Sequence, residues 1–248
     1  MRISIDKVAS STRNVPIHRH VVLGSEIPAR HGTVVAVRVL DEKAVYNQIE
    51  DPHGRMMTVH KGDVVVGVLG ERRALKGYSG VVPERIQVGD ELNLLNLGGV
   101  IGKVTSYNPE VGPPARCEVL GSVLQFPDMD RRVGVPASIF PGTVAFADKV
   151  GRMPPTVWMA GTCMHAGKTA AACSLVRSFT DRGLKVGVAK VTGVALRRDS
   201  LEMLDHGAVI ATTFADAGLA STCAGDVVPA ARGCLNAVAA SGVDVMVV

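Results

Sequence analysis

The pattern of apolar residues changes near residue 155, and this change limits the folds that the chain can adopt. Residues 30–125 contain short runs rich in Val, Leu and Ile, separated by turn residues. Such strands at close spacing are typical of a β-barrel or β-sandwich. After residue 155, apolar runs alternate with amphipathic helices, which is typical of a parallel sheet covered by helices. The sequence therefore predicts two units of different type.

In the N-terminal unit, residues 1–125, we expect strands at Thr33–Leu40, Asp63–Leu69, Glu91–Leu95 and Gly99–Thr105, and one short helix at Asp41–Ile49. The pair Arg72-Arg73 is expected on the solvated surface. Residues 126–155 hold several prolines and show little periodicity, so we interpret them as a connecting segment.

In the C-terminal unit, residues 156–248, strands and helices follow one another in strict alternation. The expected strands are Thr156–Ala160, Lys185–Val191, Ala208–Thr212 and Val243–Val248; the expected helices are Lys168–Arg182, Asp199–His206 and Pro229–Ala240. Asp199 at a helix start and glycines at the helix ends mark these boundaries.

A glycine-containing loop joins the first of these strands to the first helix. It reads Gly161-Thr162-Cys163-Met164-His165-Ala166-Gly167-Lys168-Thr169, with Ala170 after it. A loop at a helix N-terminus directs several backbone N–H groups to one point, where they can bind phosphate. Lys168 would bridge the β- and γ-phosphates, and the Thr169 hydroxyl would ligate Mg²⁺. The loop therefore predicts a P-loop for ATP, with GTP possible.

The loop resembles that of the dethiobiotin synthetase family, which reads Gly-Thr-Asp-Thr-x-x-Gly-Lys-Thr. That family's relatives include cobyric acid synthase-type amide ligases and septum-positioning ATPases; the latter carry an extra Lys where this chain has Thr162. A second match is Val188-Ala189-Lys190-Val191-Thr192-Gly193, where those synthetases place a Lys that faces phosphate and substrate. The resemblance covers residues 156–248 and is specific only in the loop. Cys163 replaces an acidic residue of the family, and residues 1–150 have no counterpart in the synthetases.

Further site residues are expected in the loops beyond the strand ends, where parallel sheets bind their ligands. Together with Lys168, Lys190 is the expected catalytic residue; Thr192, Gly193 and Arg197 are expected to contact the substrate; Thr169, Asp199 and Asp216 are expected to bind Mg²⁺. Each has a structural alternative: Asp199 as a helix N-cap, Asp216 as a turn residue, and Arg197 as a solvated charge.

The predicted fold class is α/β, with a small β-barrel or sandwich followed by a P-loop domain built on a parallel sheet. In P-loop proteins an acidic residue follows a strand like Val243–Val248, but here the sequence stops first. We therefore expect the domain to be truncated, and the chain as given to bind nucleotide weakly without turning it over.

Composition limits the partners and the location that we expect for this protein. The net charge is only +4 and no basic stripe is visible, so nucleic acid is not expected as a partner. No apolar run approaches the roughly 20 residues of a membrane span. Five cysteines without a C-x-x-C pair indicate reduced thiols and a cytoplasmic location.

The favoured function is an ATP-dependent synthetase or kinase. It would transfer the γ-phosphoryl group to a small-molecule acceptor such as a carboxylate, and we expect a homo-oligomer. The alternatives are a nucleotide-switched binding protein or metallochaperone, and a non-catalytic nucleotide-binding scaffold. No base-reading motif distinguishes ATP from GTP.

Overall fold

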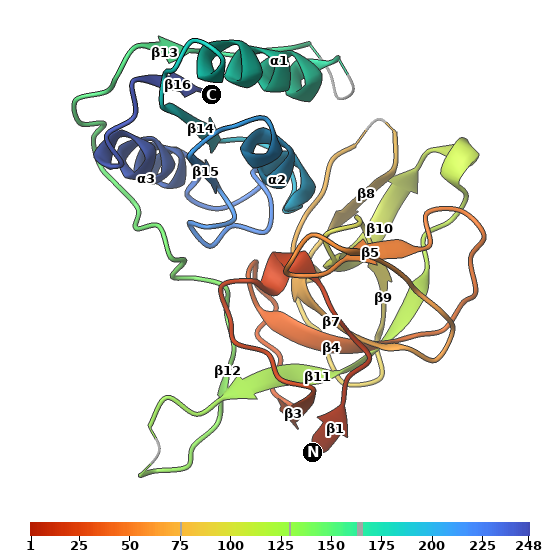
Figure 1. Cartoon of the computed structure of the whole chain (residues 1–248). Coiled ribbons are helices and arrows are strands. Elements are labelled where there is room, and N and C mark those ends of the chain that lie inside the picture. Colours follow the sequence, from red (N-terminus) through yellow and green to blue (C-terminus); the bar gives the residue numbers. More distant parts are fainter. Residues whose placement is uncertain (75, 129, 163–165) are drawn as a thin grey trace.

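The computed structural model describes every residue except 75, 129 and 163–165. Its described residues form a large mixed sheet and a smaller parallel sheet with helices, as Figure 1 shows. Strands account for 31% of the chain and helices for 17%.

The large sheet has ten strands in the described part of the chain. They are β1 (Arg2–Ser4), β2 (Lys7–Val8), β3 (His20–Gly24), β4 (Val34–Val39), β7 (Val64–Leu69), β8 (Tyr78–Val81), β9 (Glu91–Leu94), β10 (Val100–Tyr107), β11 (Arg116–Gln125) and β12 (Val135–Pro136). Most pairs are antiparallel, but β7 pairs in parallel with both β2 and β10. A separate hairpin joins β5 (Gln48–Glu50) to β6 (Met56–Thr58), and two short 3₁₀ turns lie at Ser10–Thr12 and Pro109–Val111.

Five of these strands close a ring. β4 pairs with β7, β7 with β10, β10 with β9, β9 with β11, and β11 again with β4. Successive side chains of a strand point to opposite sides. Accordingly, Val35, Val37 and Val65 join one buried cluster, whereas Val34, Ala36 and Val66 join another.

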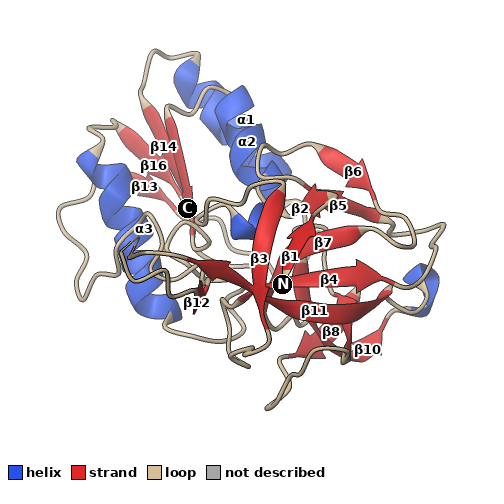
Figure 2. Ribbon diagram, turned by 90° about the horizontal axis from the view of Figure 1, so that it is seen from below, coloured by secondary structure: helices blue, strands red, loops and turns tan. Residues whose placement is uncertain are grey.

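The small sheet contains β13 (Thr156–Val157), β16 (Val245–Val247), β14 (Val186–Lys190) and β15 (Ile210–Thr213), in that order and all parallel. Helices α1 (Lys168–Thr180) and α2 (Arg198–Asp205) pack on one face, and α3 (Val227–Ala240) packs on the other, as Figure 2 shows. None of the helices in the described residues has the length and hydropathy needed to cross a membrane.

The two sheets share one apolar core. Ile5 and Val15 from the N-terminal part belong to the same buried cluster as Val238 and Met246. Residues 126–155 contact both parts of the molecule: β12 pairs with β11 in the large sheet, and the backbone of Asp148 and Lys149 accepts hydrogen bonds from side chains of α3.

The predicted α/β fold class with a P-loop domain is therefore wrong. The alternation of strands and helices supplies only three helices in the described part of the chain, and the dominant unit is a large mixed sheet. The cause is the number of Val-rich strands before residue 126, together with β12, which extends the large sheet into the predicted connecting segment.

Two local predictions are also wrong. The stretch Asp41–Ile49 forms no helix, because Tyr46 has a left-handed φ of 58° and the Asp41 carboxylate is bound by Arg116, and the last two residues of the stretch belong to β5. Of the arginine pair expected on the surface, Arg73 is exposed but Arg72 is buried: it is 5% exposed, its guanidinium donates to the Leu95 carbonyl, and it lies 5.9 Å from the centre of the Tyr46 ring.

Candidate functional site

A pocket of about 380 Å³ lies between α1, α2 and the carboxyl ends of β13, β16 and β14. We call it the α1–α2 pocket. Its lining residues are Trp158, Met159, Ala160, Gly161, Lys168, Thr169, Ala172, Val188, Ala189, Lys190, Val191, Thr192, Asp199, Ser200, Met203, Thr212, Val247 and Val248. The volume lies within the range of about 300–1,000 Å³ that is typical of small-molecule sites. Parallel sheets bind ligands at this same edge.

The first turn of α1 forms one wall of the pocket. α1 begins at Lys168, directly after Gly167, which has a left-handed φ of 81° that favours glycine. A Cβ atom added to Gly161 would lie 3.0 Å from the Lys168 Nζ atom, so the absence of a side chain at Gly161 leaves room for the lysine. The first N–H groups of a helix have no acceptor within the helix and carry partial positive charge, which favours an anion at this end.

Only the two ends of the predicted phosphate loop can be placed. Cys163, Met164 and His165 lie outside the described residues. Gly161, Lys168 and Thr169 line the α1–α2 pocket. Thr162, Ala166, Gly167 and Ala170 are exposed and are not among its lining residues.

The same pocket is also lined by a lysine and a carboxylate that pair with each other. Lys190 is the last residue of β14, and its ammonium forms an ion pair with Asp199 in the first turn of α2. Both side chains are about three-quarters buried, and Thr192 lies two residues beyond Lys190 in the lining. The structure thus brings five of the predicted site residues with charged or hydroxyl side chains to one cavity: Lys168, Thr169, Lys190, Thr192 and Asp199.

The remaining predicted residues lie elsewhere. The Arg197 guanidinium donates to the Pro52 carbonyl at 2.6 Å. Gly193 does not line the pocket but lies next to it: a Cβ added there would be 3.3 Å from the Lys190 Cε atom. Asp216 accepts hydrogen bonds from the Arg13 Nε atom at 2.8 Å and from the Thr213 backbone N–H at 2.7 Å.

Only some of the predicted magnesium ligands lie in the pocket. Thr169 and Asp199 line the α1–α2 pocket, whereas Asp216 does not. Within the described residues, no three His, Cys, Asp or Glu side chains gather into a metal-binding group. Mg²⁺ is commonly held by one or two carboxylates, with phosphates and waters completing the shell. One carboxylate and one hydroxyl, beside the loop that the sequence predicts to bind phosphate, fit that donor set.

The structure also shows lining residues that the sequence reasoning missed. Trp158, Met159 and Met203 form apolar walls, and Trp158 is 57% exposed. Trp158 is the only tryptophan in the chain and comes three residues before Gly161. This position next to the loop could have indicated a lining residue.

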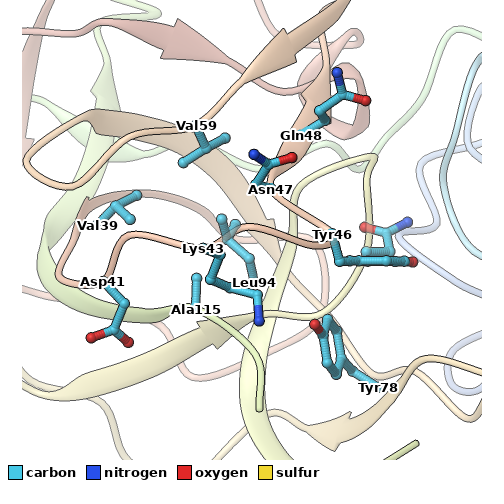
Figure 3. A pocket seen from close by; sticks show the side chains of 11 residues that line it. Val39, Asp41, Lys43, Tyr46, Asn47, Gln48, Val59, Tyr78, Leu94 and Ala115 are labelled. Carbon is cyan, nitrogen blue, oxygen red and sulfur yellow. The ribbon is translucent and has the colours of Figure 1, made fainter. Parts of the chain in front are cut away.

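A second pocket lies within the large-sheet part and is shown in Figure 3. Val39, Lys43, Tyr46 and Tyr78 are among its lining residues, and the rings of Tyr46 and Tyr78 pack edge to face with centroids 5.0 Å apart. Burial raises the pKa of Tyr78 to about 12. The space is about 20 Å³, enough for roughly one water molecule. We therefore exclude it as a site for a larger ligand.

The α1–α2 pocket is thus the candidate functional site. Comparison of the chain with known protein families, with curated proteins and with solved structures found no match.

Proposed function

We propose that this protein binds a magnesium nucleotide in the α1–α2 pocket and transfers its γ-phosphoryl group to a small-molecule acceptor. The observation that carries the proposal is the convergence of Lys168 and Thr169, at the start of α1, with Lys190 and Asp199 on one cavity.

The roles follow from the chemistry of each group. Lys168 and the first N–H groups of α1 bind the phosphates, because both present positive charge to the cavity. Thr169 and Asp199 would hold Mg²⁺, which would supply charge neutralisation at the transferred phosphoryl group. Lys190 and Thr192 orient the acceptor. Lys190, which pairs with Asp199 in the structure, would bind the anionic groups when that carboxylate holds the metal.

The apolar walls strengthen these interactions. Val188, Met203 and Val247 exclude water from one side of the cavity. Charge–charge attraction is larger where water is excluded, so a lysine in this pocket binds phosphate more strongly than one on an open surface.

The proposal is tested by calorimetric titration of the wild-type protein with MgATP and MgGTP. We expect binding of at least one nucleotide, and Lys168→Ala to weaken it roughly 10- to 150-fold, since a charge-assisted hydrogen bond contributes about 1.5–3 kcal/mol. Lys185→Ala is the matched control, because Lys185 is exposed and precedes β14 at the opposite edge of the small sheet. Equal affinities of wild type and Lys168→Ala would refute the assignment.

A second candidate is a nucleotide-switched binding protein. It is favoured by the position of Asp199 on α2, whose N-terminus contacts the large-sheet part through Glu50. Phosphate release measured with and without carboxylate acceptors separates the two. Acceptor-stimulated turnover supports the transferase, whereas acceptor-independent hydrolysis supports the switch.

A further inference from the structure

Glu50 is a fully buried carboxylate that reaches from the large-sheet part of the molecule to α2. It is the last residue of β5 and is 0% exposed. Its Oε2 atom accepts the backbone N–H of Arg197 at 2.5 Å, and its Oε1 atom accepts that of Arg198 at 2.6 Å. The partners are separated by 147 and 148 residues along the chain.

These bonds replace the cap that α2 lacks in its own sequence. The N-cap residue of α2 is Arg197, and no side chain within the helix start caps its N–H groups. Unpaired N–H groups at a helix start carry partial positive charge, so a carboxylate is the best partner for them. Glu50 therefore caps α2 from a distant part of the chain.

The β5–β6 hairpin holds α2 at two further points. The Arg197 guanidinium donates to the Pro52 carbonyl at 2.6 Å. Gly54 packs against Leu201 so closely that an added Cβ would lie 2.2 Å from the Leu201 Cδ1 atom. α2 lies on the side of the small sheet that faces this hairpin (Figure 1). The hairpin thus fixes both the position and the rotation of the first turns of α2.

The same turns carry part of the candidate site. Asp199 and Ser200 line the α1–α2 pocket immediately after the two capped residues, and Met203 lines it one turn later. Asp199 pairs with Lys190 only if the start of α2 is held close to the end of β14. A shift of α2 would move a charge in the pocket without any change in a lining residue.

From these contacts we infer that Glu50 is a positioning residue for nucleotide binding: it sets the first turn of α2, and through it Asp199. This inference rests on the proposed function. It gives the large-sheet part a role in the site, and it makes binding in the pocket and the contact between the two sheets depend on each other.

The test compares Glu50→Gln with wild type in the full chain, by calorimetric titration with MgATP and MgGTP. Gln has the same shape, but its NH₂ group faces one of the two N–H donors and cannot accept from it. We expect affinity to fall tenfold or more, with Glu50→Asp intermediate because it keeps the charge on a shorter side chain. The matched control is Glu118→Gln on the surface of β11, which should stay within twofold of wild type.

Amide hydrogen exchange without nucleotide provides a readout that a general loss of stability would not imitate. In Glu50→Gln, the amides of Arg197 and Arg198 should exchange at least tenfold faster, while those of α3 keep their protection. Equal loss of protection in α3, or an affinity equal to wild type, would overturn the inference. If wild type binds neither nucleotide, the proposed function fails, and the ligand role of Glu50 with it.

If Glu50→Gln does not fold, a measurement on the wild-type protein still tests the coupling between Glu50 and the pocket. Saturating nucleotide should slow amide exchange in residues 48–50 as well as in residues 197–200, because the two segments are bonded. Slowing at residues 197–200 alone would overturn the coupling.

Discussion

At the scale of single residues, the side chain of Arg13 links the two sheets. Its guanidinium donates to Asp216 at 2.8 Å and to the Thr213 hydroxyl, and the two charged side chains are 9% and 23% exposed. Asp216 also accepts the Thr213 N–H, as the turn interpretation expected. The Asp216 oxygens accept these hydrogen bonds outside the α1–α2 pocket. Asp216 therefore holds the two sheets together.

Asp216→Asn should therefore destabilise the fold and leave nucleotide affinity almost unchanged. Removing one partner of a buried ion pair costs about 3–5 kcal/mol. Because Asp216 is partly exposed, we expect about 2–3 kcal/mol after allowing for solvent screening. Urea unfolding measures the first effect and calorimetry the second. Glu118→Gln, in the exposed pair with Arg38, should cost less than about 1 kcal/mol. A stable Asp216→Asn protein that no longer binds nucleotide would instead support the metal role predicted from the sequence.

Asp41 provides a test by pH. Its carboxylate binds the Arg116 guanidinium at 2.9 and 3.1 Å and also the Arg116 N–H, and these bonds hold the pKa of Asp41 below its ordinary value of 3.8. A lowered pKa in the folded state means that the contribution to stability is complete above the unfolded value and is lost as the pH falls through the folded one.

The stability difference between wild type and Asp41→Asn should therefore be constant from pH 7 to about 5 and shrink below about pH 4. The effect is small because both partners are partly exposed. Urea midpoints measured at each pH provide the comparison. A difference that stays constant down to pH 3 would show that the ionised pair is not its source.

At the scale of elements, local signals predict the helices and strands that they border. The helix expected at Lys168–Arg182 is present at Lys168–Thr180, and that expected at Pro229–Ala240 begins two residues earlier, at Val227. Strands expected at Thr33–Leu40 and Asp63–Leu69 are also present, at Val34–Val39 and Val64–Leu69, but their distant pairing partners were not predicted. The helix expected at Asp199–His206 is present as α2 at Arg198–Asp205, but its start is capped by Glu50 and not by Asp199, and no local pattern contains that information.

Gly98 lies in close contact with the segment before α2, so a substitution there tests how tightly the large-sheet part packs against the small-sheet part. A Cβ added to Gly98 would lie 1.8 Å from the Ala195 carbonyl oxygen, which also accepts the Asn96 amide at 2.8 Å. Gly98→Ala should destabilise the protein by about 1–3 kcal/mol, because backbone would have to move. Gly151→Ala is the control: the nearest atom there is 3.7 Å away, and we expect a change within about 0.5 kcal/mol. Thermal unfolding of both variants gives the comparison, and equal midpoints would contradict this packing.

At the scale of the whole molecule, the change of pattern near residue 155 predicted the four parallel strands but not the dominant architecture. Pairings such as β7 with β10, and the closure of the ring through β9 and β11, depend on contacts between distant segments. The apolar cluster shared by Ile5 and Met246 has the same origin. The convergence of residues on the pocket was more predictable, since Lys190 ends β14 and Lys168 and Asp199 lie at the starts of helices beyond strand ends, which a parallel sheet brings to one edge.

The central claim is that nucleotide binds in the α1–α2 pocket, in contact with both α1 and α2. The most direct measurement is amide hydrogen exchange of the wild-type protein with and without saturating MgATP or MgGTP. The account predicts slower exchange at residues 166–172, 190–192 and 197–203, accompanied by residues 48–50 through Glu50, and no change at Lys43 and Tyr46 in the small pocket. Protection confined to the large-sheet part, or none at any described residue of the α1–α2 pocket at saturation, would contradict it.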